Sequence, residues 1–298
     1  MSSGVAASIR IATRGSRLAR WQAEHVGQLL RDAHADGLGI EPELVVVSTT
    51  GDVQRDVPIH ALGGTGVFVK EVQQAVLDGR ADIAVHSAKD LPSDTPAGLL
   101  LACVPERGDA RDALVGARLD EIPHGGTVGT GSVRRRAQLA ALRPDLVFAE
   151  LRGNIETRLE RVLGPERHYD AIVMAVAALQ RLERTDAIAE IIAIDTMVPQ
   201  IAQGALAIEC RADDDATRVA LAAIDHPASH RCVTAERAFL AAVGGGCDLP
   251  VAAHAVVEGS KIVLVAEQFD GVGAPARRVR VEGTDPETVG RDAAQSAT

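Results

Sequence analysis

Short hydrophobic runs alternate with helical periods over the first two thirds of the chain. Apolar residues three and four positions apart predict amphipathic helices over Leu18–Leu29 and Phe68–Val76. The runs that predict buried strands are Glu43–Ser48, Asp82–His86, Leu99–Val104, Thr127–Gly129, Leu146–Phe148 and Ala171–Met174. Strands and helices that alternate in this way are typical of an α/β fold.

The chain divides where this pattern is interrupted. The polar segment Pro105–Ala113 (PERGDARDA) predicts a crossover into a second α/β unit, which runs to about Pro199. The next apolar run, Ala205–Cys210, predicts a strand that returns to the first sheet. Two α/β domains joined by two crossovers are therefore expected.

A different order of elements begins at about Pro227. A helical pattern over Ser229–Ala242 precedes two hydrophobic strands over Val251–Val257 and Lys261–Glu267, and the ending GRDAAQSAT predicts a short or frayed helix. This order predicts a small α+β domain. The expected boundaries are residues 1–105 with 205–223 for domain 1, 106–204 for domain 2, and 227–298 for domain 3.

Composition and charge exclude several classes of protein. The chain has 298 residues, of which 46% are hydrophobic, and this is ample for two or three buried cores. Lys and Arg number 31 against 41 Asp and Glu, so no overall positive field attracts nucleic acid or an anionic membrane. Only six residues are aromatic, which leaves few platforms for base stacking. We expect neither nucleic acid nor a membrane as a partner.

The N-terminus and the cysteines indicate the compartment. The first residues lack the charged and apolar regions of a secretion signal, and no apolar run is long enough to span a membrane. Cys103, Cys210, Cys232 and Cys247 form no CxxC pair and have no metal-like spacing with histidine. We expect a cytoplasmic protein without a disulfide framework and without a metal site.

Three arginine-rich segments follow predicted strands and open predicted helices. In RIATRGSRLARWQA, Ser16 is placed to cap a helix, with Arg14 beside the free backbone N–H groups. In GTGSVRRRAQL the cap is Ser132, and in LRGNIETRLE it is Asn154. Because ligands gather at the carboxyl ends of strands in open α/β sheets, three such junctions predict a site for an anion.

The second segment places Arg134, Arg135 and Arg136 in the first helical turn. Cations there oppose the helix macrodipole, at a cost of roughly 0.3 to 1 kcal/mol each. Three of them at one helix end indicate that an anion binds there. For any one segment alone, a solvated charged helix face is the alternative interpretation.

A carboxylate and a lysine follow the predicted strand DIAV. The segment VHSAKDLP delivers His86, Ser87, Lys89 and Asp90 at the end of that strand. Positive neighbours favour the ionised form of Asp90, which makes it the candidate general acid and base. A loop salt bridge is the alternative for Asp90 and Lys89, and His86 is interpreted as a structural histidine.

Cys247 lies in the segment GGGCDLP. Three preceding glycines predict a loop that presents the thiol. Together with the separate cationic segments, such a thiol indicates a tethering point that faces a site for a small polyanion. The alternative is a buried cysteine that packs as a small hydrophobic side chain.

Eight segments together resemble the hydroxymethylbilane synthase family, also called porphobilinogen deaminase. They are RIATRGSRLARWQ, GGTGVFVKE, ADIAVHSAKDLP, GTGSVRRRAQL, LRGNIETRL, AQGALAIECR, VTAERA and GGGC, and their order and spacing match over nearly the whole chain. The resemblance implies two domains of the type II periplasmic-binding-protein kind, with the active site between them, and a third domain that carries the cysteine. It also implies a monomer.

The resemblance further implies the chemistry and the residues that perform it. A dipyrromethane cofactor is bound covalently to Cys247, four porphobilinogen molecules are added with loss of ammonia, and hydrolysis releases hydroxymethylbilane. Asp90 falls on the catalytic carboxylate. Cofactor-binding positions fall on Ser87, Lys89, Asp90, Thr130, Ser132, Arg134, Arg135, Arg152 and Arg158. Substrate-handling positions fall on Arg14, Ser16, Gln22, Phe68, Arg152, Arg158, Arg181 and Gln203, with Phe68 in the mobile lid of the family.

The chain departs from the family pattern at several positions. Ala61 and Thr65 stand where lysines are found and Thr50 where arginine is found, so the lid is less cationic. Ala202 stands where glycine is common, and Gly244 replaces an acidic residue.

Two other classes of function fit the sequence less well. A non-catalytic binding module of the periplasmic type for small anions does not need a tethering thiol. A phosphate-handling transferase lacks the GxxxxGK[ST] loop.

Overall fold

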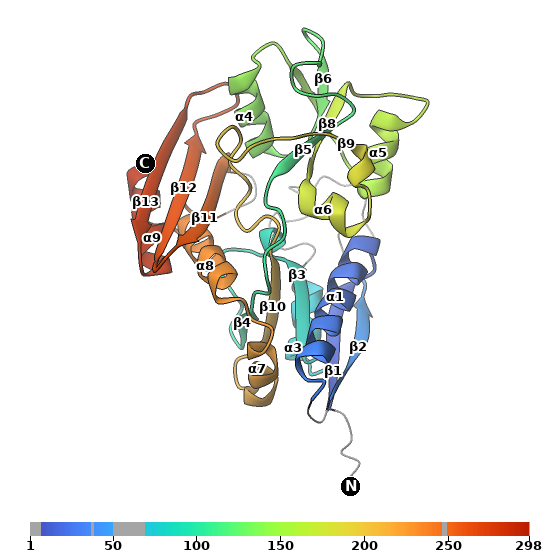
Figure 1. Cartoon of the computed structure of the whole chain (residues 1–298), viewed down its shortest axis with the longest axis vertical. Coiled ribbons are helices and arrows are strands. Elements are labelled where there is room, and N and C mark those ends of the chain that lie inside the picture. Colours follow the sequence, from blue (N-terminus) through green and yellow to red (C-terminus); the bar gives the residue numbers. More distant parts are fainter. Residues whose placement is uncertain (1–6, 37–38, 50–68, 246–248, 298) are drawn as a thin grey trace. The chain divides into compact units, whose positions relative to one another are not determined.

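The computed structural model describes residues 7–36, 39–49, 69–245 and 249–297. The chain forms two compact units, which we call unit 1 (residues 1–107 and 205–230) and unit 2 (residues 108–204 and 231–298). The elements of both units are labelled in Figure 1. The chain passes from unit 1 to unit 2 after Arg107 and back after Gly204.

Unit 1 contains a five-stranded mixed sheet. Its strands are β1 (Ala7–Arg14), β2 (Ile40–Val47), β3 (Ile83–Ser87), β4 (Leu99–Cys103) and β10 (Leu206–Arg211), in the order β2-β1-β3-β10-β4. Strand β1 runs parallel to β2 and β3, whereas β10 runs antiparallel to β3 and β4. The helical elements are α1 (Arg17–Ala33), α3 (Lys70–Leu77), α7 (Asp215–Ala222) and the 3-10 turn η2 (Ala88–Asp90).

The helices α1 and α3 cover opposite faces of this sheet, as the alternating side chains of β1 and β3 show. Ile11 and Ile83 pack in one buried cluster with Val26 and Leu30 of α1. The next residues along the strands, Ala12 and Ala84, pack in a second cluster with Val72 and Val76 of α3. Successive side chains of a strand point to opposite faces, so the two helices cover the two sides.

Unit 2 contains a second five-stranded sheet with the same plan. Its strands are β5 (Asp112–Val115), β6 (Thr127–Gly129), β7 (Val147–Ala149), β8 (Ala171–Ala175) and β9 (Ile188–Ile191), in the order β7-β6-β8-β5-β9. Strand β6 is parallel to β7 and β8, and β5 is antiparallel to β8 and β9. The helical elements are α4 (Val133–Leu142), α5 (Ile155–Leu163), α6 (Val176–Arg181) and the 3-10 turn η3 (Thr185–Ala187).

In both sheets the antiparallel inner strand is the one that the chain enters after changing units. The first residue of β10, Leu206, lies opposite Ser87 at the end of β3. The first residue of β5, Asp112, lies opposite Ala175 at the end of β8. Each crossover therefore arrives at the edge where the parallel strands have their carboxyl ends, which is the edge where α/β sheets bind ligands.

The C-terminal part of unit 2 is a three-stranded antiparallel sheet with helices. It consists of α8 (Pro227–Ala242), which begins in unit 1, β11 (Val251–Glu258), β12 (Lys261–Phe269), β13 (Ala276–Gly283) and α9 (Pro286–Ala297). Gly290 lets α9 lie close to α8, because a Cβ at this position would clash with the carbonyl oxygen of Ala235 and with Ala238.

The predicted fold class, two α/β sheets followed by a small α+β region, is confirmed. Each predicted strand overlaps an observed one, and the return of Ala205–Cys210 to the first sheet is confirmed by β10. The sequence did not predict β5, β9, β13, α6 or α7. The prediction of a short or frayed C-terminal helix was wrong, since α9 has 12 residues and buries Val289 and Ala293. The boundaries of three separate domains stay a prediction.

Candidate active site

The carboxyl edge of the unit 1 sheet carries most of the predicted residues of that unit. Strand β1 ends at Arg14, and Ser16 then caps α1 by accepting a hydrogen bond from the N–H of Ala19 over 3.3 Å. Strand β3 ends at Ser87 and leads directly into η2, which ends at Asp90. Because β1 and β3 are parallel neighbours, these two groups of residues lie at the same edge.

One hydrogen bond joins residues from these two segments. Gln22 Nε2 on α1 donates to Ser87 Oγ over 2.8 Å, and Gln22 is buried. Lys89 is half-buried and Asp90 is exposed. The carboxylate of Asp90 is therefore open to a ligand, while Ser87 is held from the protein side by Gln22.

His86 is buried one residue before this edge. Its Nε2 lies 3.1 Å from Oε2 of Glu209, which is itself buried on β10. Gln73 of α3 donates to both oxygens of Glu209, over 3.1 and 2.9 Å. This placement agrees with the interpretation of His86 as a structural histidine.

The corresponding edge of unit 2 begins with the junction of β6 and α4. Ser132 caps α4 by accepting from the N–H of Arg135 over 3.4 Å, as the sequence predicts. Thr130 is buried, and its Oγ1 accepts from the N–H of Ser132 over 3.2 Å. Asn154 likewise caps α5, accepting from the N–H of Thr157 over 2.8 Å.

Arg134 and Arg135 converge on Asp112, a residue that the sequence analysis did not single out. Arg134 Nη2 donates to Oδ2 over 2.7 Å, and Arg135 donates to Oδ1 from Nη2 over 2.7 Å and from Nε over 3.1 Å. All three side chains are buried, and Asp112 is 0% exposed. The carboxylate of Asp112 therefore neutralises part of the positive charge of Arg134 and Arg135.

The cluster of Asp112, Arg134 and Arg135 retains a surplus of positive charge. Burial acts to raise the pKa of Asp112, but Arg134 and Arg135 outweigh it and hold that pKa well below its usual range. Asp112 is therefore ionised and neutralises one of the two arginines. Burial lowers the pKa of Arg134, and the attraction of Asp112, which acts to raise it, does not fully compensate.

A second, more exposed arginine group lies after β7. Arg136 Nη2 donates to Glu150 Oε2 over 2.8 Å, and Arg152 Nη2 lies 3.5 Å from Glu150 Oε1. Arg158 is half-buried, and its Nε donates to the carbonyl oxygen of Gly153 over 2.8 Å. Arg136 lies in the first turn of α4, whereas Glu150 and Arg152 follow β7 and Arg158 lies in the first turn of α5, all at the edge where β6 and β7 end.

The remaining predicted residues of unit 2 lie at the second crossover. Arg181 Nη2 donates to the carbonyl oxygen of Gly204 over 2.7 Å, and burial lowers the pKa of Arg181 to about 10, which still leaves it cationic at neutral pH. Gln203 is 0% exposed, and its Nε2 donates to the carbonyl oxygen of Ala110 over 2.7 Å and to Asp112 Oδ1 over 3.0 Å. Gln203 thus faces the protein interior.

Cys247 and Phe68 lie outside the described residues, as do Thr50, Ala61 and Thr65. The cysteines that the structure describes, Cys103, Cys210 and Cys232, are all buried thiols. Burial raises the pKa of Cys103 far above its usual range and that of Cys210 to about 11. Both are poor nucleophiles, because the thiolate is the reactive form.

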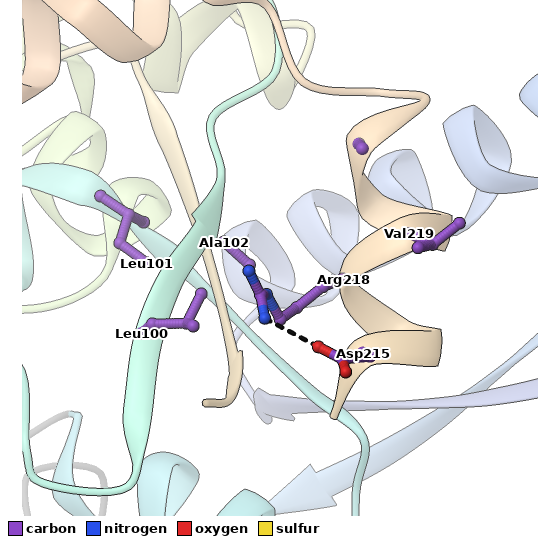
Figure 2. Close-up of a pocket in the computed structure, with 7 residues that line it drawn as sticks. Leu100, Leu101, Ala102, Asp215, Arg218 and Val219 are labelled. Carbon is purple, nitrogen blue, oxygen red and sulfur yellow. Dashed lines mark hydrogen bonds and ion pairs between the residues drawn. The ribbon is translucent and has the colours of Figure 1, made fainter. Parts of the chain in front are cut away.

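A pocket of about 490 Å³ in unit 1 lies away from these residues. Figure 2 shows Leu100, Leu101 and Ala102 of β4 on one side and Arg218 and Val219 of α7 on the other. Arg218 is paired with Asp215 on its own helix over 2.8 Å. No predicted site residue lines this pocket.

Within the part of the chain that the structure describes, no three His, Cys, Asp or Glu side chains are grouped to hold a metal ion. Among the same residues, no helix combines the length and the apolar character that crossing a membrane requires.

The solved structures that match the chain include solute-binding proteins. The ligand-binding component of an ABC-type import system from Staphylococcus aureus is 11% identical, with 78% of this chain and 73% of that chain covered and a TM-score of 0.40. A TRAP periplasmic solute-binding protein from Pseudomonas putida F1 is 9% identical, with 73% and 77% covered and a TM-score of 0.38.

Curated relatives are much closer in sequence. The porphobilinogen deaminase of Nitratidesulfovibrio vulgaris strain DP4 is 49% identical over 288 residues, covering 91% of this chain and 90% of the relative. That of Syntrophotalea carbinolica is 47% identical, covering 87% and 81%, and that of Geobacter sulfurreducens is 43% identical, covering 95% and 88%.

Two family models also match the chain in sequence. Residues 9–219 match "porphobilinogen deaminase, dipyromethane cofactor binding domain", and residues 230–298 match "porphobilinogen deaminase, C-terminal domain". Since these matches cover most of the chain and the relatives agree with them, the chain belongs to the porphobilinogen deaminase family.

Proposed function

We propose that the residues gathered at the carboxyl edges of the two sheets carry out the reaction of the porphobilinogen deaminase family. The chain is a transferase that condenses porphobilinogen into hydroxymethylbilane with the help of a dipyrromethane cofactor. Family membership does not assign roles to single residues, so the roles below are our proposal. A non-catalytic anion-binding module is not favoured, because the relatives named above are deaminases.

The residues of unit 2 fit a cofactor that carries carboxylates. Arginine side chains and serine and threonine hydroxyls suit carboxylate oxygens, and the cluster around Asp112 has a surplus positive charge. Among the described residues, Arg134 Nε is also buried without a hydrogen-bond partner. When bound, dipyrromethane supplies the pyrrole to which the substrate is joined. We propose that it is attached to Cys247 and held by Ser87, Lys89, Asp90, Thr130, Ser132, Arg134, Arg135, Arg152 and Arg158.

Asp90 is the proposed catalytic group. It is exposed at the end of η2 and follows a buried strand that fixes its backbone. As a carboxylic acid it gives a proton to the amino group of porphobilinogen, which leaves as ammonia. As a carboxylate it stabilises the positive charge on the pyrrole nitrogen, and it accepts the proton that the attacking pyrrole carbon loses when the new carbon–carbon bond forms.

The remaining cationic and polar residues are proposed to hold the substrate. Each porphobilinogen brings an acetate and a propionate, so negative charge accumulates as the product grows, and arginine forks match such groups. The proposed set is Arg14, Ser16, Gln22, Phe68, Arg152, Arg158, Arg181 and Gln203. Of these, Gln22 and Gln203 are buried, and they donate hydrogen bonds to Ser87 and to the carbonyl oxygen of Ala110.

The observation that carries this proposal is the position of Asp90 at the strand end beside the Gln22–Ser87 hydrogen bond, in a chain of this family. The test is to incubate the purified chain with porphobilinogen and to measure ammonia and the pyrrole product together. We expect one ammonia for each porphobilinogen consumed and a linear tetrapyrrole as product. Binding of porphobilinogen without release of ammonia would contradict the proposal.

We also infer that the chain works as a monomer in the cytoplasm, without nucleic acid or membrane. Buried free thiols at Cys103, Cys210 and Cys232 suit a reducing compartment. The net charge of −10 gives no overall positive field that would attract nucleic acid or an anionic membrane. Light scattering on the eluted protein tests the oligomeric state.

A further inference from the structure

Asp112 is the point at which three separate segments of unit 2 meet. It is the first residue of β5, and it accepts hydrogen bonds from two residues of α4 and from Gln203 of the second crossover. None of these contacts is local in sequence, since Gln203 is 91 residues away and the arginines are 22 and 23 residues away. A change at Asp112 therefore affects all three segments.

Each arginine also has a second anchor on the backbone. Arg134 Nη1 donates to the carbonyl oxygen of Val198 over 2.9 Å, and Arg135 Nη1 donates to that of Val173 over 2.9 Å. A planar guanidinium that is held by a carboxylate on one side and a carbonyl on another has one orientation. The donors that these contacts do not use are then fixed in direction as well.

The electrostatic balance also depends on Asp112. With this carboxylate ionised, the two buried arginines carry one net positive charge, and without it they carry two at close range. Glu267 of β12 is another buried acid that attracts Arg134, but burial raises its pKa, and its Oε1 lies 3.4 Å from Arg278 Nη1. Asp112 is thus the carboxylate to which both arginines donate hydrogen bonds.

We infer that Asp112 is a positioning residue, which orients Arg134 and Arg135 so that they can hold the carboxylates of the cofactor. This inference rests on the proposed function, because it assigns those two arginines to the cofactor. Asp112 itself is completely buried and makes no contact with substrate in this role. Gln203 supports it, because the same amide nitrogen that donates to Asp112 also donates to the carbonyl oxygen of Ala110 at the first crossover.

The test compares Asp112→Asn with Asp112→Glu in the full-length chain. Asparagine keeps the shape and removes the charge, whereas glutamate keeps the charge and shifts the oxygens by one methylene. The readout is the fraction of the folded, eluted protein whose intact mass includes dipyrromethane, with folding checked by circular dichroism. We expect a loss of about tenfold in the loaded fraction for Asp112→Asn, on the scale of losing an orienting partner at a ligand site. Asp112→Glu should restore part of it.

The matched control is Asp145→Asn in the same unit. Asp145 accepts from Arg143 Nε and Nη2, both over 2.7 Å, and it precedes β7 at the opposite edge of the sheet. This variant should load dipyrromethane as the parent does.

Each outcome decides a different point. An unloaded parent would contradict the proposed function itself. A loaded parent with an equally loaded Asp112→Asn would overturn only the positioning role. If neither Asp112 variant folds, or if Asp145→Asn loses the cofactor to the same extent, Asp112 is a general stability residue and the inference is withdrawn.

Discussion

Gly108 and Gly204 bring the two crossovers together within unit 2. The N–H of Gly108 donates to the carbonyl oxygen of Gly204 over 3.2 Å. Gly204 has a φ of +86°, and a Cβ there would lie 2.6 Å from the carbonyl oxygen of Gly108. Two backbone segments can therefore approach this closely only because residue 204 has no side chain.

Gly204→Ala should destabilise the protein by at least about 2 kcal/mol, since both the positive φ and the backbone clash act against the methyl group. Urea unfolding measures the change. Gly259→Ala is the control, because Gly259 also has a positive φ (+62°) but nothing within 4 Å of the added Cβ. Equal losses of stability in the two variants would mean that the close approach of the crossovers contributes nothing.

Arg134→Ala and Arg135→Ala should each reduce cofactor loading and leave a folded apo-protein of lower stability. Each change deprives the buried Asp112 of one partner, and breaking a buried pair costs about 3 to 5 kcal/mol. Intact mass measures the loading. Arg218→Ala is the control, since Arg218 forms an exposed pair with Asp215 on α7. If all three variants load dipyrromethane equally, these arginines do not hold it.

Asp90→Asn should keep the fold and the cofactor but lower the turnover of porphobilinogen by roughly a hundredfold or more, the usual scale for losing an acid-base group. The initial rate of ammonia release measures this. Asp94→Asn is a suitable comparison, because Asp94 is an exposed carboxylate four residues further along the same segment. Near-normal turnover in Asp90→Asn would remove Asp90 from the catalytic role.

The depressed pKa of Asp112 predicts how stability depends on pH. A group whose folded pKa is lowered contributes its full stabilisation above the unfolded value of about 3.9, and this contribution is lost as the pH falls from there through the folded pKa. The difference in unfolding free energy between the parent and Asp112→Asn should therefore be constant from about pH 7 to pH 5 and shrink towards about pH 3. A difference that stays constant over the whole range would show that the charge of Asp112 is not the cause.

Local sequence patterns were sufficient to predict strands made entirely of buried residues and helices that begin after a capping residue. Ala171–Ala175 is a run of five buried residues, and the caps Ser16, Ser132 and Asn154 lie directly before the helices that they start. The four-residue strand β5 was missed because its first two residues, Asp112 and Ala113, are the last two of the polar segment PERGDARDA. Strand β13 was missed because it is an outer strand with no buried residue, and it begins with three exposed residues, Ala276, Arg277 and Arg278.

The site was predicted less completely, for a reason that concerns tertiary contacts. Arg134 and Arg135 were identified from their place at a helix start, but nothing near them in sequence indicates that Asp112 is their partner. Asp112 lies in a stretch of charged residues that looks solvated, but in the structure it is buried at the start of β5, beneath Arg134, Arg135 and Gln203. The contacts of Gln203 with Ala110 and Asp112 were likewise not visible in the sequence, and its role in substrate handling stays a prediction. One feature of the sequence does indicate a buried carboxylate: Asp112 directly precedes the hydrophobic run Ala-Leu-Val.

Peptide mapping of the native chain by mass spectrometry would show which cysteine carries dipyrromethane. Cys103, Cys210 and Cys232 are buried, and burial keeps Cys103 and Cys210 in the unreactive thiol form. We expect the added mass to lie on the peptide that contains Cys247, Cys247→Ser to abolish it, and Cys103→Ser to leave it in place. An adduct on Cys103, Cys210 or Cys232, or an adduct that persists in Cys247→Ser, would rule out Cys247 as the attachment point.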